Sequence, residues 1–166
     1  NGIAGRVIAM GHENEKPGQH NGAEYARVGI APSLAFGLGT ENRATLSYYF
    51  IKSNDEPDSG IPFNNPNNPP PGSIKADGRP ANVKQGSYYG WKDRDFDKRE
   101  NHIGSLKLEH DFNDDLTVSN TATYSHSKAS YMYTNPDDSK SNIYNGKVYR
   151  RATQTIRDTD AFTDQL

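Results

Sequence analysis

The sequence predicts an all-β fold of antiparallel, up-and-down strands, and three observations lead to this prediction. Apolar and polar residues alternate with a period of two over several segments, which is the side-chain period of a strand. The connections between these segments alternate between short and long. Only 32% of the residues are hydrophobic and the mean hydropathy is -0.97, whereas soluble domains usually contain about 45–50% apolar residues. Either the apolar residues occupy one face of the strands, or much of the chain is solvated.

Four segments alternate clearly and are expected to be strands: 28–38, 44–50, 105–112 and 116–125. His110 interrupts the apolar side of the third segment, and Asn120 interrupts that of the fourth. Two flanking segments, 6–12 and 148–162, are weaker candidates, because the second is polar on both faces.

The first clear strand is unusually long and contains a proline. Extended structure from Ala23 to Leu38 would cover about 16 residues, where strands of soluble sheets usually have about five or six. Pro32 lacks the N–H that a ladder hydrogen bond needs, and proline is normally confined to edge strands or bulges. A closed barrel has no edge strand, so Pro32 argues against one, although a local bulge could accommodate it.

The connections predict which ends of the strands lie together. Short turns at 39–43 and 113–115 fall at one end, and longer connections at 13–22, 53–99 and 133–146 fall at the other. Bacterial membrane barrels have this asymmetry, with polar residues facing the lumen. The longest connection is rich in Pro, Asn and Gly between 57 and 80, which opposes regular structure. A membrane barrel is therefore favoured over a soluble sandwich or repeat, although the strands of either would look alike locally.

Several function classes are excluded by composition and motifs. The 19 basic and 21 acidic residues give a net charge of -2, so no basic stripe indicates nucleic-acid binding. There is no cysteine and no nucleophile or phosphate-binding motif, so no catalytic residue is proposed. Asp93, Asp95 and Asp97 begin like a calcium loop, but Lys98 and Gly104 stand where Gly and Glu are required. No metal ligand is proposed, and the histidines are interpreted as ordinary surface groups.

Several motifs resemble the barrel of TonB-dependent ferric-siderophore receptors, especially the catecholate type. They are 25–39 (YARVGIAPSLAFGLG), 46–50 (LSYYF), 57–62 (PDSGIP), 88–98 (YYGWKDRDFDK) and 110–117 (HDFNDDLT). The resemblance covers about residues 6–160. One departure is Gly18-Gln19-His20, which stands where relatives often carry Gly-Arg-Asp.

The resemblance implies a barrel of about 22 strands in the bacterial outer membrane, plugged by an N-terminal globular domain. Residues 1–166 would form one partial barrel domain of about six strands from mid-barrel, with the plug and the remaining strands elsewhere. The implied partners are a ferric siderophore, outer-membrane lipid, and a TonB-type energy-transducing protein that contacts the absent N-terminal region. The iron would arrive already chelated, so no cofactor is implied.

The candidate ligand-binding residues combine aromatic rings with cations near the end of the longest connection. They are Tyr88, Tyr89, Trp91, Lys92, Arg94 and Arg99, with Phe96 and Lys98 nearby. A ferric tris-catecholate chelate is a bulky aromatic anion, so its rings can stack on Tyr or Trp while its charge attracts Arg and Lys. Alternatively, Arg94 pairs with Asp93, Asp95 or Asp97 and the aromatic residues fold the loop onto the barrel rim.

A second class of function also fits the composition. The abundance of Tyr, Asn and Gly would suit a soluble or surface-anchored β-rich adhesin or a carbohydrate-binding module. The two hypotheses differ in what contacts the apolar face of the strands: lipid in the receptor, and a second protein layer in the adhesin.

Overall fold

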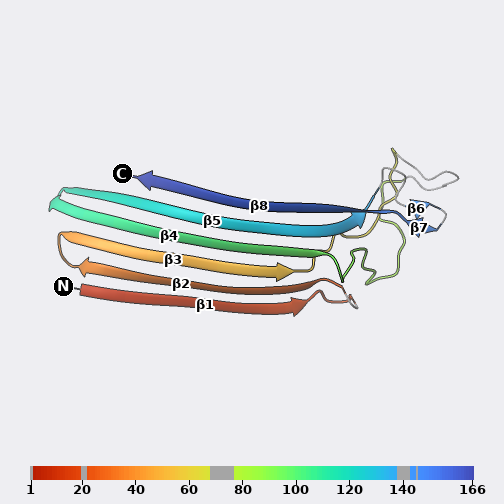
Figure 1. The fold of residues 1–166 in the computed structure, drawn as a ribbon, viewed down its shortest axis with the longest axis horizontal. Coiled ribbons are helices and arrows are strands. Elements are labelled where there is room, and N and C mark those ends of the chain that lie inside the picture. Colours follow the sequence, from red (N-terminus) through yellow and green to blue (C-terminus); the bar gives the residue numbers. More distant parts are fainter. Residues whose placement is uncertain (1, 20–21, 68–76, 138–142, 145) are drawn as a thin grey trace.

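One antiparallel sheet dominates the computed structural model, which describes residues 2–19, 22–67, 77–137, 143–144 and 146–166. The sheet has six strands in the order β1-β2-β3-β4-β5-β8, and β6 and β7 form a separate small hairpin (Figure 1). The bounds are β1 Gly2–Glu15, β2 Glu24–Leu38, β3 Asn42–Asp55, β4 Phe96–Asn113, β5 Leu116–Pro136, β6 Ile143–Tyr144, β7 Lys147–Val148 and β8 Arg150–Gln165. Among the described residues, no helix is long and apolar enough to cross a membrane.

The short turns lie at one end of the sheet and the long connections at the other (Figure 1). In the β2–β3 turn the Thr40 N–H donates to the Gly37 carbonyl at 3.0 Å. Gly37 has a φ of 71°, and a Cβ there would lie 2.0 Å from the Asn42 carbonyl oxygen, so only glycine fits. In the β4–β5 turn the Asp115 N–H donates to the Asn113 side chain at 2.9 Å. The predicted separation of short and long connections is confirmed.

The register places apolar and polar residues on opposite faces of the sheet. One row of cross-strand neighbours is apolar and runs through Leu34, Leu46, Leu106 and Ala122. The adjacent row, one residue earlier or later on each strand, is polar: Arg6 on β1 is followed by the hydroxyl side chains of Ser33, Ser47, Ser105, Thr123 and Thr163. Because successive side chains of a strand point to opposite faces, the sheet has one apolar face, called here the outer face, and one polar face, called here the inner face.

The apolar limit of the outer face shifts from strand to strand. On β2 the outer apolar residues continue toward the loop end as far as Val28, whose partner on β3 is already Lys52. On β3 they end at Phe50, whose partner on β4 is His102. The apolar band therefore ends nearer the turns on β4 than on β2.

No second protein layer covers the outer face within the described residues. Large apolar side chains on this face are exposed, as Leu46 is at 52% and Leu106 at 42%. The buried residues instead lie at the loop end of the molecule: Ala23, Pro62, Ala81, Asp95 and Thr134. The sandwich hypothesis requires a second sheet against the apolar face, and the described part of the chain supplies none.

The strands are longer than the alternation alone predicts. The weaker candidates 6–12 and 148–162 are full members of the sheet, as β1 and β8. The connection expected at 53–99 spans only 56–95, because polar residues extend β3 and β4 beyond the apolar band. The hairpin β6–β7 lies partly within the connection expected at 133–146 and was not predicted. Residues 68–76 of the Pro-rich stretch lie outside the described residues.

Pro32 lies within the sheet without a bulge. β1 pairs with Pro32 in unbroken register through Val7. The pairing of β2 with β3 passes from Ile30–Phe50 to Ser33–Ser47 without a shift, omitting Ala31 and Pro32. The missing N–H is thus accommodated by a short gap in one ladder, not by an extra residue.

Candidate ligand-binding site

A buried carboxylate anchors the end of the long loop to the sheet. Asp95 immediately precedes β4, and its side chain is fully buried. It accepts hydrogen bonds from the Trp91 N–H at 2.9 Å, the Thr134 N–H at 2.7 Å and the Thr134 hydroxyl at 2.9 Å. Because Thr134 lies on β5, these bonds attach residues 91–95 to the loop end of a neighbouring strand.

The anchored loop presents an aromatic ring among cations. The Trp91 side chain is 49% exposed, and the Arg94 guanidinium carbon lies 4.5 Å from its ring centroid. The guanidinium carbon of Arg150, at the start of β8, lies 6.0 Å from the same centroid. Arg150 also donates to the Tyr89 and Gly90 carbonyl oxygens at 3.2 and 3.0 Å. We call Trp91, Arg94 and Arg150 the loop cluster.

Arg94 also has a structural role in the loop. Its Nε lies 3.3 Å from Asp95 Oδ1, and its guanidinium donates to the Thr134 hydroxyl. The pairing of Arg94 with a neighbouring aspartate, which the alternative interpretation names, is thus present with Asp95. These bonds fix the guanidinium over the Trp91 ring, so the position of one cation in the cluster is defined.

Two other predicted residues hold the loop in place. The Tyr88 hydroxyl donates to the Pro57 carbonyl at 3.0 Å, and burial, with the charges of Asp95 and Glu56 adding to it, raises the pKa of Tyr88 to about 12. Lys92 pairs with Glu24 and lies 3.9 Å from Glu56. Burial raises the pKa of Glu56, partly offset by Lys92. Tyr88 and Lys92 thus connect the long loop to β2 and to the residues after β3.

Arg99, the last predicted residue, lies on the inner face of β4, apart from the loop cluster. One register row of that face carries an arginine on every second strand: His12, Arg27, Ser53, Arg99, Ala129 and Arg157. Arg27 pairs with Asp55 at 3.2 Å and Arg99 with Asp97 at 2.9 Å. A hollow of about 400 Å³ lies between Arg27 and Arg99. The inner face therefore presents cations at one level, below the loops.

The loop between β1 and β2 has its own anchor. The Asp58 side chain is nearly buried, pairs with Lys16, and accepts from Gln19 Nε2 and the Gly60 N–H, each at 2.9 Å. Burial alone would raise the pKa of Asp58, but these partners outweigh it and hold the pKa below its usual value. Gln19 thus takes part in the pairing that holds this loop. His20 lies outside the described residues.

Strand pairing also brings together one group that sequence spacing did not reveal. His126 on β5 lies with its Nδ1 2.8 Å from Asp160 and its Nε2 3.5 Å from Asp158, both on β8. Among the described residues these three side chains have a geometry that could hold a metal ion. They lie on the outer face and already satisfy one another, and no metal role is assigned to them.

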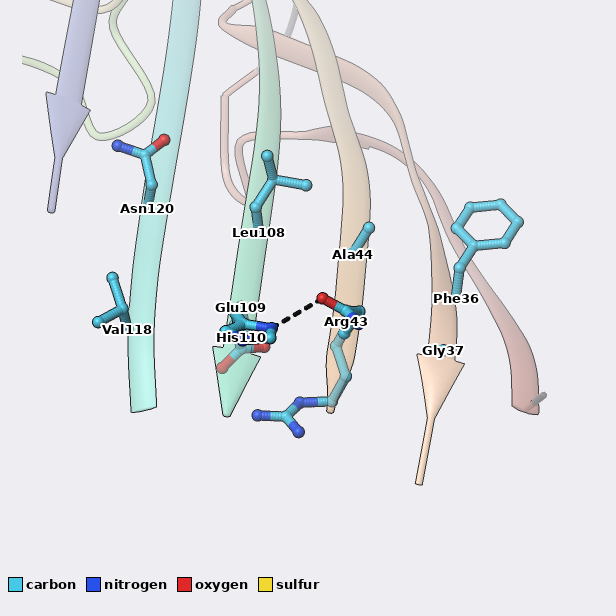
Figure 2. Close-up of a pocket in the computed structure, with 10 residues that line it drawn as sticks. Phe36, Gly37, Arg43, Ala44, Leu108, Glu109, His110, Val118 and Asn120 are labelled. Carbon is cyan, nitrogen blue, oxygen red and sulfur yellow. Dashed lines mark hydrogen bonds between the residues drawn. The ribbon is translucent and has the colours of Figure 1, made fainter. Parts of the chain in front are cut away.

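A depression of about 440 Å³ lies at the turn end of the sheet (Figure 2). Phe36, Ala44, Leu108 and Val118, from four strands, contribute outer-face apolar side chains to it. His110 Nδ1 donates a 2.8 Å hydrogen bond to Asn42 Oδ1 there. Because its walls belong to the apolar band, we assign this depression to the hydrophobic surface of the sheet and not to a ligand site.

A single sheet with an exposed apolar face, a polar inner face and ordered loops at one end defines the class of protein: this is part of the wall of an outer-membrane β-barrel. No family model matches the sequence. The probable TonB-dependent siderophore receptor PiuA of Acinetobacter baumannii is 60% identical over all of this chain, which corresponds to 22% of that protein. The catecholate siderophore receptor Fiu of Escherichia coli K12 is 33% identical over 95% of this chain and 20% of its own length.

Solved structures agree. The crystal structure of the siderophore receptor PiuA from A. baumannii superposes with a TM-score of 0.86 over 99% of this chain and 23% of that one. The open form of the ferric-catecholate import receptor Fiu gives 0.82 at 29% identity, over 98% of this chain and 26% of that one. The chain belongs to the TonB-dependent siderophore receptors of the outer membrane, and it spans about a fifth of the length of the curated relatives. These relatives are transport receptors, and the adhesin alternative finds no support among them.

Proposed function

We propose that the intact receptor containing this segment imports a ferric catecholate siderophore across the outer membrane. The names of the Fiu relatives, which specify catecholate, support this substrate class. Residues 1–166 would serve as a partial barrel domain that contributes wall and loops. The plug, and the contact with a TonB-type energy-transducing protein, would lie in other parts of the receptor. The iron enters as part of the substrate, so the wall needs no cofactor of its own.

The observation that carries the proposal is the exposed Trp91 ring with Arg94 at 4.5 Å and Arg150 at 6.0 Å. A tris-catecholate chelate presents aromatic rings and negative charge on the same surface. An indole ring offers stacking area, and guanidinium groups offer charge and planar hydrogen-bond donors. In this proposal Trp91, Tyr89 and Arg94 contact the chelate, while Tyr88 and Lys92 hold the loop in place.

The inner face offers the next contact along the same path. Arg99 faces the hollow beside Arg27, at the loop end of the wall. The exposed parts of both guanidinium groups remain able to attract an anion, although Asp97 and Asp55 neutralise part of their charge. We propose that Arg99 meets the chelate after it leaves the loop cluster.

The test is binding of a ferric tris-catecholate chelate to the intact receptor in detergent. Trp91→Ala is expected to weaken binding about tenfold, the loss that an aromatic stacking contact of about 1.5 kcal/mol would produce. Trp91→Phe keeps an aromatic ring and is expected to retain most of the affinity.

Ile61→Ala is the matched control, since Ile61 is an exposed apolar residue of the same long loop. Heat-modifiable gel migration reports whether each variant has an assembled barrel. Unchanged affinity in assembled Trp91→Ala protein would remove the loop cluster as a binding site, and an equal loss in Ile61→Ala would show that the effect is not local to Trp91.

A further inference from the structure

The inner face of β5 carries only small side chains over most of its length. Alternate residues of a strand share a face, and from the turn end to the level of Arg99 every inner residue of β5 is Ser, Thr or Ala. No charged or large side chain interrupts this run, which we call the hydroxyl track. Its members are Thr117, Ser119, Thr121, Thr123, Ser125, Ser127 and Ala129.

The hydroxyl track is long enough to cross the membrane. From 117 to 129 the strand extends about 40 Å. Strands of membrane barrels are tilted by about 35–45°, and the apolar band that they cross is about 25 Å tall. The track therefore provides hydroxyl groups at every depth of the wall between the arginine row and the turns.

The inner faces of the strands on one side of the track are different. Tyr49 on β3 and Ile103 on β4 are register partners at mid-depth, and their side chains are 41% and 37% exposed. Both strands have neighbours on either side, so this exposure does not come from a sheet edge. β2 has small residues on this face between 29 and 37, but Ser33 is the only one of them with a hydroxyl.

On its other side the track is widened by β8, which lies next to β5 (Figure 1). The inner residues of β8 are small at the levels where β3 and β4 are bulky. Thr159, Ala161 and Thr163 pair with Ser127, Ser125 and Thr123. Over this stretch two adjacent strands thus present small, mostly hydroxyl-bearing side chains to the lumen.

The loop end of the track lies at the loop cluster. Tyr131 and Tyr133 continue the inner face of β5, and their rings stack with centroids 5.2 Å apart. The next residue, Thr134, donates to Asp95, which also accepts from the Trp91 N–H. These bonds place the loop cluster at the loop end of β5, where the aromatic groups of the loop and of the strand follow one another.

Two cations flank the first residue of the track. Ala129 lies between Arg99 of β4 and Arg157 of β8 in the register. Arg99 pairs with Asp97 at 2.9 Å. Arg157 is exposed and makes no ion pair within the part of the chain that the structure describes. An anion that leaves the loop cluster therefore meets a positive charge on each side of the entrance to the track.

The chemistry of the track suits the movement of such an anion. Hydroxyl groups donate hydrogen bonds in place of water, and hydrogen bonds between neutral groups and an anion are weaker than those that cations add. A path conducts when its sites are favourable enough to enter and weak enough to leave. Small side chains also leave the most room for a bulky chelate beside the wall.

We propose that the ferric chelate moves along the hydroxyl track of β5, from Arg99 and Arg157 toward the turn end of the wall. This inference deepens the proposed function and rests on it, because it takes the chelate as the substrate. It assigns to β5, bordered by β8, the part of this wall that the substrate follows, and it excludes the bulky inner face of β3 and β4.

The experiment measures uptake of a radiolabelled ferric tris-catecholate chelate by cells that carry the intact receptor, together with binding of the chelate to the purified receptor. Thr123→Trp places an indole ring in the middle of the track. Ser47→Trp is the matched control, because Ser47 lies in the same cross-strand row at the same depth but on β3. Thr123→Trp is expected to lower uptake about tenfold with unchanged binding, since the ring narrows the path. Ser47→Trp should retain uptake.

A second variant removes the hydroxyl groups without adding bulk. T121V/T123V/S125A/S127A is expected to lower uptake several-fold, and it tests the proposal even if Thr123→Trp does not assemble. Heat-modifiable gel migration reports assembly of each variant. Unchanged uptake by assembled Thr123→Trp or by the hydroxyl-free variant, or an equal loss in Ser47→Trp, would each overturn the proposal. Trp91→Ala lowers binding whereas these variants lower uptake at full binding, so the two proposals fail separately.

Discussion

At the scale of single residues, Asp95 decides whether the loop cluster exists. Its carboxylate receives donors from two separate segments, Trp91 and Thr134, so it sets the position of the indole ring relative to the sheet. A buried carboxylate with several donors is a rigid connection, because breaking it leaves polar groups without partners.

We predict that Asp95→Asn loosens the loop without preventing barrel assembly. The amide cannot accept all of the donors that the carboxylate accepts, and an unpaired buried group costs about 1–3 kcal/mol. The measurement is hydrogen exchange of residues 77–95 in the intact receptor, where faster exchange is expected. The control is Asp93→Asn, because Asp93 is exposed two residues earlier. Equal exchange in the two variants would contradict the anchoring role of Asp95.

The Lys16–Asp58 pair predicts a pH dependence for the neighbouring loop anchor. The pKa of Asp58 is held below its usual value despite burial, so its contribution to stability is present above the unfolded pKa of about 3.9 and is lost as the pH falls through the folded pKa. The pKa of Lys16 is raised, mainly by its hydrogen bond to Asp58, so its contribution is lost as the pH rises above about 10.4.

Protease cleavage within residues 56–60, followed from pH 7 to pH 3 with an acid-tolerant protease, would test this. Cleavage should increase toward pH 3 in the unmodified receptor, because protonated Asp58 no longer pairs with Lys16. Asp58→Asn should already be cleaved at pH 7 and respond little to acid. A flat profile in the unmodified receptor would show that the pair does not hold this loop.

At the scale of elements, the conformation of the β2–β3 turn depends on Gly37 more than on Gly39. Gly37 and Gly39 both have positive φ values, 71° and 79°, but only a Cβ at Gly37 meets backbone atoms. Gly37→Ala therefore adds a steric clash to the backbone strain that both substitutions introduce.

We expect Gly37→Ala to lower the temperature at which the barrel unfolds by more than Gly39→Ala does. Strain in a left-handed conformation alone costs about 1 kcal/mol, and the clash adds to it. Heat-modifiable gel migration over a temperature series measures both. If Gly39→Ala proves the more damaging substitution, the close approach of Asn42 is not what limits this turn.

The strands also show which features of the fold could be predicted from the sequence. Alternation identified the apolar side correctly because each strand carries that information locally, as Leu34, Leu46 and Leu106 do. It underestimated β4 and β5, because their loop-side halves lack a clear alternation of apolar and polar residues. The positions of Arg150 beside Trp91, and of Asp160 beside His126, depend on the register between β5 and β8. No local pattern encodes that register, so these contacts could not be predicted.

At the scale of the whole molecule, the exposed apolar face is the feature on which the membrane assignment depends. Leu106 and Ser105 are adjacent on β4 but face opposite sides of the sheet, in the apolar row and the hydroxyl row respectively. Substitutions at the two positions therefore compare the two environments within a single strand.

We predict that Leu106→Arg impairs assembly of the intact receptor and that Ser105→Arg does not. An arginine on the lipid face costs about 2–4 kcal/mol at the bilayer midplane and less toward its borders, whereas the inner face is solvated. The yield of folded receptor in isolated outer membranes is the measurement. Normal assembly of Leu106→Arg together with failure of Ser105→Arg would reverse the assignment of the two faces.

The loop-side limit of the apolar band lies at Val28 on β2, nearer the turns at Phe50 on β3, and nearer still on β4. This shift has a geometric consequence. The border of a bilayer is flat, so an apolar limit that shifts along neighbouring antiparallel strands can coincide with it only if the strands are tilted from the membrane normal. The side-chain chemistry of β2, β3 and β4 therefore indicates that the strands are tilted, and in which direction, within this part of the barrel alone.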